Sequence, residues 1–204
     1  NNLNEWDVSN ATNMSYMFRN CLAFNQDLSS WDTSSVILMN HMFYDCISFN
    51  QPLNTWNVSN VTNMSYMFYD CLAFNQPLNT WNVSSATNMS YMFRNCLAFN
   101  QPLNTWNVSS ATNMGSMFYG CPIFNQDLSS WDIINVTSFI DFLSLSALST
   151  TNYDALLVGW NANIHNNNVT FNGGLSTFTL GSAAETARTA LIADGWIISD
   201  NGGI

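Results

Sequence analysis

Hydrophobic and polar positions alternate along this chain in a block that returns every 25 residues. Trp recurs at positions 6, 31, 56, 81, 106 and 131, and Cys recurs at 21, 46, 71, 96 and 121. The pair Met-Phe and the triplet Phe-Asn-Gln return at the same interval without insertions. A fixed period of about 20–29 residues is typical of a solenoid, in which each unit stacks on the previous one. The pattern therefore predicts stacked repeat units over residues 1–148.

Each unit divides into two parts with different hydrophobic spacing. Leu53, Trp56 and Val58 follow the L-x-x-L-x-L spacing of leucine-rich repeats, which predicts a short parallel strand. Apolar residues spaced by three and four then predict a short helical return, over Val61, Met64, Met67, Phe68 and Cys71. Because these residue types are kept from unit to unit, we assign them to the core and interpret the methionines as interior filling.

The period fades after Leu143, and residues 149–204 follow another pattern. We expect a helix that is capped by Thr150 or Thr151, with a stripe of apolar residues at Tyr153, Leu156, Leu157 and Trp160. A strand is expected over 169–171, a second helix from a capping box at Ser182 to about Ala193, and a final strand over 196–198. Such a segment closes a solenoid whose last unit would otherwise expose apolar surface and an unpaired edge.

The expected fold is an α/β repeat solenoid. It consists of a leucine-rich-repeat-like stack of short parallel strands and short helical turns over residues 1–148, with an α/β C-terminal cap over residues 149–204 packed on the last repeat. Asn25-Gln26 and the copies of this pair are expected to form polar ladders from unit to unit. The five cysteines fall at one position of the unit with parallel side chains, which disfavours disulfides and predicts buried free thiols.

Charge narrows the classes of partner. Lys and Arg total 3, Asp and Glu total 13, and the formal net charge is −10. Nucleic acid is therefore disfavoured as a partner, because phosphate binding needs clustered basic residues. Membrane insertion is also not expected, since no run of apolar residues reaches the roughly 20 that a membrane helix needs.

The unit itself resembles a known family. The stretch V-T-N-M-S-Y-M-F-Y-D-C-L-A-F-N-Q-P-L-N-T-W-N-V-S, from Val61 to Ser84, resembles a bacterial surface-protein repeat of about 25 residues that is related to the BspA-like leucine-rich repeats. Residues 152–196 look like the segment that often closes such arrays. The resemblance implies secretion, display on the cell surface and adhesion. Since the chain opens in mid-pattern and ends on Gly202-Gly203, we expect further repeats or domains of the same parent chain at both ends.

Candidate binding residues are those that vary between units, because variable positions of a repeat tend to face outward. One column consists of Tyr and Arg, which are enriched in binding hot spots: Arg19, Tyr44, Tyr69, Arg94 and Tyr119. Another column contains Tyr16, His41, Tyr66, Tyr91 and Ser116, and a third contains Asn20, Asp45, Asp70, Asn95 and Gly120. The alternative interpretation is a solvated helical face. A second candidate surface is the polar strand face that contains Asn54, Thr55 and Asn57 with their copies.

These features favour an extracellular binding or adhesion module of a larger bacterial surface protein, which contacts a protein or glycan on another cell or surface. The alternatives are a spacer or stalk without its own ligand, and ice or mineral binding by a flat repetitive face. An enzyme is not expected, because no catalytic set of residues is evident and His41 and His165 stand alone. We expect no cofactor, with calcium at Asp7, Asp32 and Asp132 as an alternative.

Overall fold

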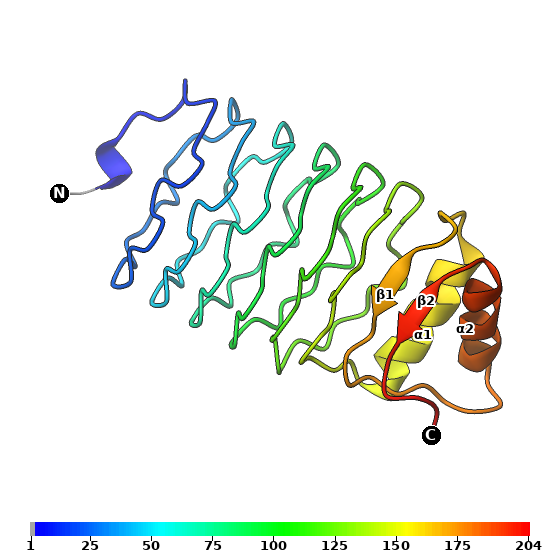
Figure 1. Cartoon of the computed structure of the whole chain (residues 1–204). Coiled ribbons are helices and arrows are strands. Elements are labelled where there is room, and N and C mark those ends of the chain that lie inside the picture. The colour runs from blue at the N-terminus through cyan, green and yellow to red at the C-terminus, as the bar shows by residue number, and fades with distance from the viewer. Residues whose placement is uncertain (1–2) are drawn as a thin grey trace.

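The computed structural model describes residues 3–204, in which a row of similar loops ends in a small α/β segment (Figure 1). The elements, in chain order, are η1 (Leu3–Glu5), α1 (Thr150–Ala162), β1 (Thr170–Asn172), α2 (Ala183–Ala193) and β2 (Ile197–Ser199). The loops of the repeat units lie side by side from the N-terminal end to the yellow helix α1. We call residues 3–148 the repeat array.

Between η1 and α1 the described chain contains neither a helix nor a strand, only turns, bends and isolated bridges. The strand expected over Leu53–Val58 is instead a turn, in which the Trp56 N–H donates to the Leu53 oxygen over 3.1 Å. The expected helical return is interrupted because Tyr66 and Asp70 adopt left-handed φ angles of 58° and 56°. The prediction of a short strand and a short helix in each unit was therefore wrong, since left-handed residues recur too often for a helix to propagate.

Backbone hydrogen bonds join each unit to the next. Parallel bridges connect the same position of successive units: Asn13, Leu38, Asn63, Asn88, Asn113 and Ser138. From each bridge onward, alternate N–H groups donate to the following unit; those of Met64, Tyr66, Phe68 and Asp70 reach Asn88, Ser90, Met92 and Arg94 over 2.9–3.0 Å. Residue i therefore lies beside residue i+25 along the array.

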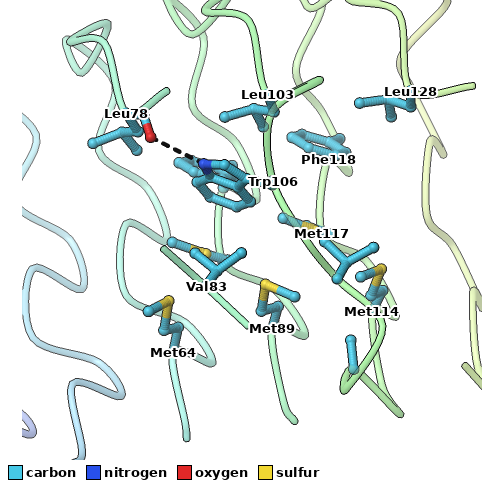
Figure 2. Packing of buried hydrophobic residues seen from close by; sticks show 14 of the residues in the cluster. Met64, Leu78, Val83, Met89, Leu103, Trp106, Met114, Met117, Phe118 and Leu128 are labelled. Atoms are coloured by element: carbon cyan, nitrogen blue, oxygen red, sulfur yellow. Dashed lines mark hydrogen bonds between the residues drawn. The ribbon is translucent and has the colours of Figure 1, made fainter. Parts of the chain in front are cut away.

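The interior of the array consists of columns of identical side chains. Trp31 and Trp56 stack with their rings 2° from parallel, and the Trp indoles from Trp31 to Trp131 are at most 3% exposed. Each indole N–H also donates to a leucine carbonyl of the previous unit; Trp106 reaches the Leu78 oxygen over 2.9 Å (Figure 2). The indole N–H is the only polar group of each ring. Because it has an acceptor in the previous unit, the columns bury a large aromatic surface without leaving a polar group unpaired.

The predicted Asn-Gln ladders are confirmed. Asn75 N–H donates to the Asn50 side chain over 3.0 Å, and the Gln76 amide donates to the same Asn50 oxygen over 3.0 Å. The cysteines also form hydrogen bonds between units, since the Cys71 thiol donates to the Phe43 carbonyl oxygen over 3.0 Å. All five cysteines are free, as expected. Cys21, however, is exposed, so the expectation of a wholly buried thiol column was wrong at the first unit.

The helix α1 continues two columns of the array although it has a different backbone. Trp160 donates its indole N–H to the Leu128 oxygen over 3.1 Å, which is the bond that each repeat Trp makes. Asn152 donates its side-chain amide to Asn125 over 2.9 Å, as the repeat glutamines do. The N-cap is Ser149, whose hydroxyl accepts from the Asn152 N–H, and not Thr150 or Thr151 as expected. Ser149 can do so because its φ and ψ remain outside the helical region.

The remaining elements close the C-terminal end. β1 pairs in parallel with β2, and Phe139 bridges to Phe171 of β1, which joins this sheet to the array. α2 begins at the expected Ser182 cap and packs against α1. Asp200, with its side chain only 2% exposed, accepts hydrogen bonds from the Arg188 guanidinium over 2.8 Å and from the Tyr153 hydroxyl over 2.8 Å. This buried cluster ties the end of the chain to both helices.

Candidate functional site

The two columns singled out for binding lie beside each other on the outside of the array. We call them the arginine–tyrosine column (Arg19, Tyr44, Tyr69, Arg94 and Tyr119) and the tyrosine–histidine column (Tyr16, His41, Tyr66 and Tyr91). Rings of the two columns contact each other, since Tyr66 and Tyr69 have centroids 5.7 Å apart and His41 and Tyr44 have centroids 5.6 Å apart. The structure therefore brings all the candidate residues together, apart from Ser116, which is buried at 2% exposure.

Turn geometry, not a helix, orients these side chains. The tyrosine–histidine column sits at left-handed positions, with φ of 64° at Tyr16, 57° at His41, 58° at Tyr66 and 61° at Tyr91. Bulky residues rarely adopt this region, and Asn or Gly would fit it at lower cost. The backbone conformation thus does not explain why tyrosine occupies this position in three units.

Within each column the rings stack face to face from unit to unit. In the tyrosine–histidine column the centroid distances are 4.6 Å, 4.5 Å and 4.4 Å in order from Tyr16 to Tyr91. Tyr44 and Tyr69 of the other column lie 4.5 Å apart and 4° from parallel. Each inner ring therefore has its faces covered by its neighbours, although these residues remain partly exposed.

The two arginines are held over rings. Arg19 lies 4.9 Å from the Tyr44 centroid, and Arg94 lies 4.0 Å from that of Tyr119 and 5.7 Å from those of Tyr69 and Tyr91. Cation–π contacts of this kind stabilise by about 0.5–2 kcal/mol. Neither arginine forms an ion pair with a carboxylate of residues 3–204, and the buried Nε of Arg94 has no hydrogen-bond partner there. The two guanidinium groups therefore have no ion-pair partner in this part of the chain, while the Arg94 Nε itself is closed to solvent.

Burial shifts the titration of this surface. Burial is the largest cause that raises the pKa of the Tyr66 and Tyr69 phenols. The second cause is the neighbouring Tyr91 for Tyr66 and the neighbouring Asp70 for Tyr69. Burial also lowers the pKa of His41, and the nearby Arg19 adds to that effect. Both effects favour the neutral forms of the Tyr66 and Tyr69 hydroxyls and of the His41 imidazole.

The polar surface around Asn54, Thr55 and Asn57, which was expected to be a strand face, uses its hydrogen-bonding groups within the array. The hydroxyls of Thr55, Thr80 and Thr105 donate to carbonyl oxygens of the previous unit over 2.8–2.9 Å. Asn57 accepts the Ser59 N–H within its own turn over 3.1 Å. This second candidate surface therefore has less capacity for a ligand than the stacked columns.

The candidate calcium ligands are likewise used in turns. Asp7 accepts from the Ser9 N–H over 3.1 Å, Asp32 from the Ser34 N–H over 3.0 Å and Asp132 from the Ile134 N–H over 3.2 Å. Residues 3–204 hold no group of three or more His, Cys, Asp or Glu side chains placed to bind a metal ion. The same part of the chain has no surface pocket. The arrangement can therefore make broad surface contacts.

One exposed column was missed by the sequence reasoning. The residues after the first four cysteines are Leu22, Ile47, Leu72 and Leu97, and all four are exposed, whereas Pro122 follows Cys121. We call these four residues the aliphatic column. The spacing gave no signal for this column, because Leu72 lies four residues after Phe68 and so fits the spacing of three and four that marks the core residues.

Comparison with known proteins gives a family but no described relative. A family model with the description "Mycoplasma protein of unknown function, DUF285" matches residues 1–96 and 59–156. No curated protein and no solved structure matches the chain. Among the residues that the structure describes, no helix has the length and apolar character to cross a membrane.

Proposed function

We propose that this chain, which belongs to the family described as "Mycoplasma protein of unknown function, DUF285", is a binding or adhesion module of a larger bacterial surface protein. In this proposal the array is a repeat solenoid related to BspA-like leucine-rich repeats, displayed outside the cell. Its ligand is a protein or glycan on another cell or surface. The observation that carries the proposal is the continuous stacked surface of the arginine–tyrosine and tyrosine–histidine columns.

The stacking favours a protein ligand over a glycan. Sugar rings commonly bind on an aromatic face, and a ring inserted between two tyrosines needs about 7 Å between them, since each contact takes about 3.5–4 Å. The tyrosine–histidine rings are only 4.4–4.6 Å apart. Ring edges, hydroxyls and guanidinium groups remain, and these suit the polar and aromatic contacts of protein interfaces.

The competing proposal is a spacer without a ligand. A spacer needs only the buried columns and the ladders between units. A spacer role therefore does not explain why tyrosine occupies strained, outward-facing positions. The two proposals differ in what happens when the outward side chains are removed and the scaffold is kept.

The experiment is binding of the immobilised chain to cultured cells, purified surface proteins and a glycan array, with and without the column side chains. Tyr66→Ser and Tyr69→Ala are combined, because Ser116 shows that serine fits the left-handed position, with φ 55°. We expect at least a tenfold loss of affinity for the ligand found, which corresponds to about 1.4 kcal/mol. Leu175→Ser, at an exposed position outside the columns, is the matched control. Unchanged binding by the double variant, or no binding to any probe, supports the spacer.

A further inference from the structure

The aliphatic column is a row of exposed apolar side chains that recurs from unit to unit of the array. Leu22, Ile47, Leu72 and Leu97 are 50%, 36%, 37% and 48% exposed, whereas the apolar core positions of the same units from Trp31 onward are at most 3% exposed. Exposed apolar residues that are scattered singly need no explanation. Here the same choice recurs in four consecutive units, and contiguous exposed apolar surface marks an interaction site.

The members of this column are neighbours in space. The Ser48 N–H donates to the Leu22 oxygen over 3.3 Å, and the Ala73 N–H donates to the Ile47 oxygen over 3.2 Å. Parallel bridges between units set their spacing at about 4.8 Å. The four side chains therefore form one stripe along the array.

A negative edge runs beside the stripe. Asp45 and Asp70 stand two residues before Ile47 and Leu72, so their Cα atoms lie within about 7 Å of the stripe. Burial raises the pKa of the Asp70 carboxyl, and the Asn95 amide, which donates to it over 2.7 Å, opposes this effect. The charge of Asp45 raises this pKa further, and that of Arg94 lowers it. Neither carboxylate has an ion-pair partner among residues 3–204. The chain as a whole carries a net charge of −10.

We propose that the aliphatic column and the carboxylates of Asp45 and Asp70 dock an amphipathic helix of a partner protein that carries basic residues along one edge of its apolar stripe. This inference rests on the proposed binding function and names the partner class. It adds a second contact surface beside the tyrosine columns. Charge complementarity selects a basic partner, because two carboxylates one unit apart gain from an opposing cation.

The spacing of the units selects a helix over a strand. A helix presents one apolar residue per turn, or about every 5.4 Å, so after three units it is about 2 Å out of step with the stripe. An extended segment presents side chains on one face about every 6.8 Å and is about 6 Å out of step over the same distance. A partner helix that lies along the array can thus place one apolar residue against each unit.

The test uses a synthetic helical peptide of about 18 residues, with leucine once per turn and lysine along one edge of the leucine stripe, and a twin with glutamate at the lysine positions. Binding to the full chain is measured by fluorescence anisotropy. We expect the lysine peptide to bind and the glutamate twin to bind at least tenfold more weakly. We also expect Asp45→Asn with Asp70→Asn, and separately Leu72→Gln with Leu97→Gln, to weaken the lysine peptide about tenfold.

The aspartate substitutions are matched to the fold, because Asn20 and Asn95 occupy the same left-handed position in other units. Leu175→Ser is the control for the leucine substitutions and should bind the lysine peptide as the unaltered chain does. Equal binding of the two peptides, full binding by either double variant, or no binding overturns the inference. Concentration-dependent dimers that Leu72→Gln with Leu97→Gln abolishes also overturn it, in favour of a second copy of the chain.

Failure of this inference is distinguishable from failure of the proposed function. If the lysine peptide fails while Tyr66→Ser with Tyr69→Ala still reduces binding of the surface ligand, the binding function stands and the helix-docking inference falls. If the lysine peptide binds as expected and no surface ligand depends on the tyrosine columns, the aliphatic column remains a docking site and the proposed role of the tyrosines falls.

Discussion

The first and last units of the array contain matching residues in contrasting surroundings. Trp6 is 50% exposed, whereas Trp131, at the same position of the last unit that carries this Trp, is fully buried. Cys21 is exposed, and Ser146 at the corresponding position near α1 is buried. The Ser146 hydroxyl donates to the Phe118 oxygen over 2.7 Å, as Cys96 does to the Phe68 oxygen over 2.9 Å. A unit of this protein is therefore buried by its neighbours and not by its own fold.

The two ends also differ in what covers them. At the C-terminal end, α1 and β1 supply a tryptophan, an asparagine and backbone partners that continue the columns of the array. At the other end the Trp31 indole donates to the Leu3 oxygen of η1 over 2.9 Å and the Ser30 hydroxyl to the Asn4 oxygen over 3.0 Å, but Trp6 beside η1 remains 50% exposed. Interactions near α1 should accordingly be costly to remove, and their equivalents at the first unit should not be.

The largest effect that we expect is alkaline destabilisation by the buried thiols. Burial raises the pKa of Cys46 and Cys121 to about 12 from 9.0, and it raises those of Cys71 and Cys96 well above 9.0. These thiols stay protonated in the folded chain while the unfolded chain ionises. The stability they contribute is thus complete below pH 9 and is lost as the pH rises from 9 towards 12.

By pH 10 each of the four buried thiols should lower the free energy of unfolding by about 1 kcal/mol, and the four together by several kcal/mol, because the pH then lies above the cysteine pKa of the unfolded chain. Urea unfolding at pH 8 and pH 10 measures this difference. Cys96→Ser, which keeps a donor as Ser146 does, should reduce the loss by about a quarter, and Cys21→Ser should not change it. A loss that is the same in all three proteins would contradict the prediction.

The next effect compares one residue type at two places. Trp81→Ala removes a 3%-exposed indole and its hydrogen bond to the Leu53 oxygen, and should cost about 3–5 kcal/mol. Trp6→Ala should cost less than about 1 kcal/mol, because half of that side chain already faces solvent. Urea unfolding of the two variants gives the difference. Similar costs would show that the first unit is as well packed as the interior.

A smaller effect tests the closure of the C-terminal end. Asp200→Ala leaves the Arg188 charge and the Tyr153 hydroxyl without their partner and should cost about 3 kcal/mol. Asp194→Ala is the control, because Asp194 is 47% exposed and pairs with His165 over 3.2 Å. That pair should contribute less than about 1 kcal/mol. Thermal unfolding of both variants checks that Asp200→Ala costs more than Asp194→Ala. Equal shifts in Tm would contradict this prediction.

The smallest effect concerns the first unit of the array, where Cys21 is exposed. In the native protein a thiol reagent such as dithionitrobenzoate should modify Cys21 rapidly and the other four cysteines only after unfolding, because their burial suppresses the thiolate. Cys21→Ser should remove the rapid phase and change stability by less than about 0.5 kcal/mol. Rapid modification of more than one thiol per chain would show that the interior units open readily.

The sequence by itself determined which residues contact which. The period of 25 predicted that Asn50 and Asn75, or the Trp residues of adjacent units, lie beside each other. It also predicted α1, α2 and the strands near 170 and 198 to within about two residues. Periodicity and capping residues are local signals, and the contacts between units repeat them without interruption, so both can be read from the chain.

Only the tertiary structure decided the path of each unit and the surfaces that follow from it. Tyr66 at φ 58° is disfavoured locally, and the hydrogen bond from its N–H to Ser90 of the next unit, with similar bonds at Phe68 and Asp70, compensates the cost. Local propensities do not include these hydrogen bonds between units. The strand and the helix expected within each repeat unit therefore did not form. The same turns place tyrosine rings face to face and leave Leu72 exposed, which the spacing of residues alone did not reveal.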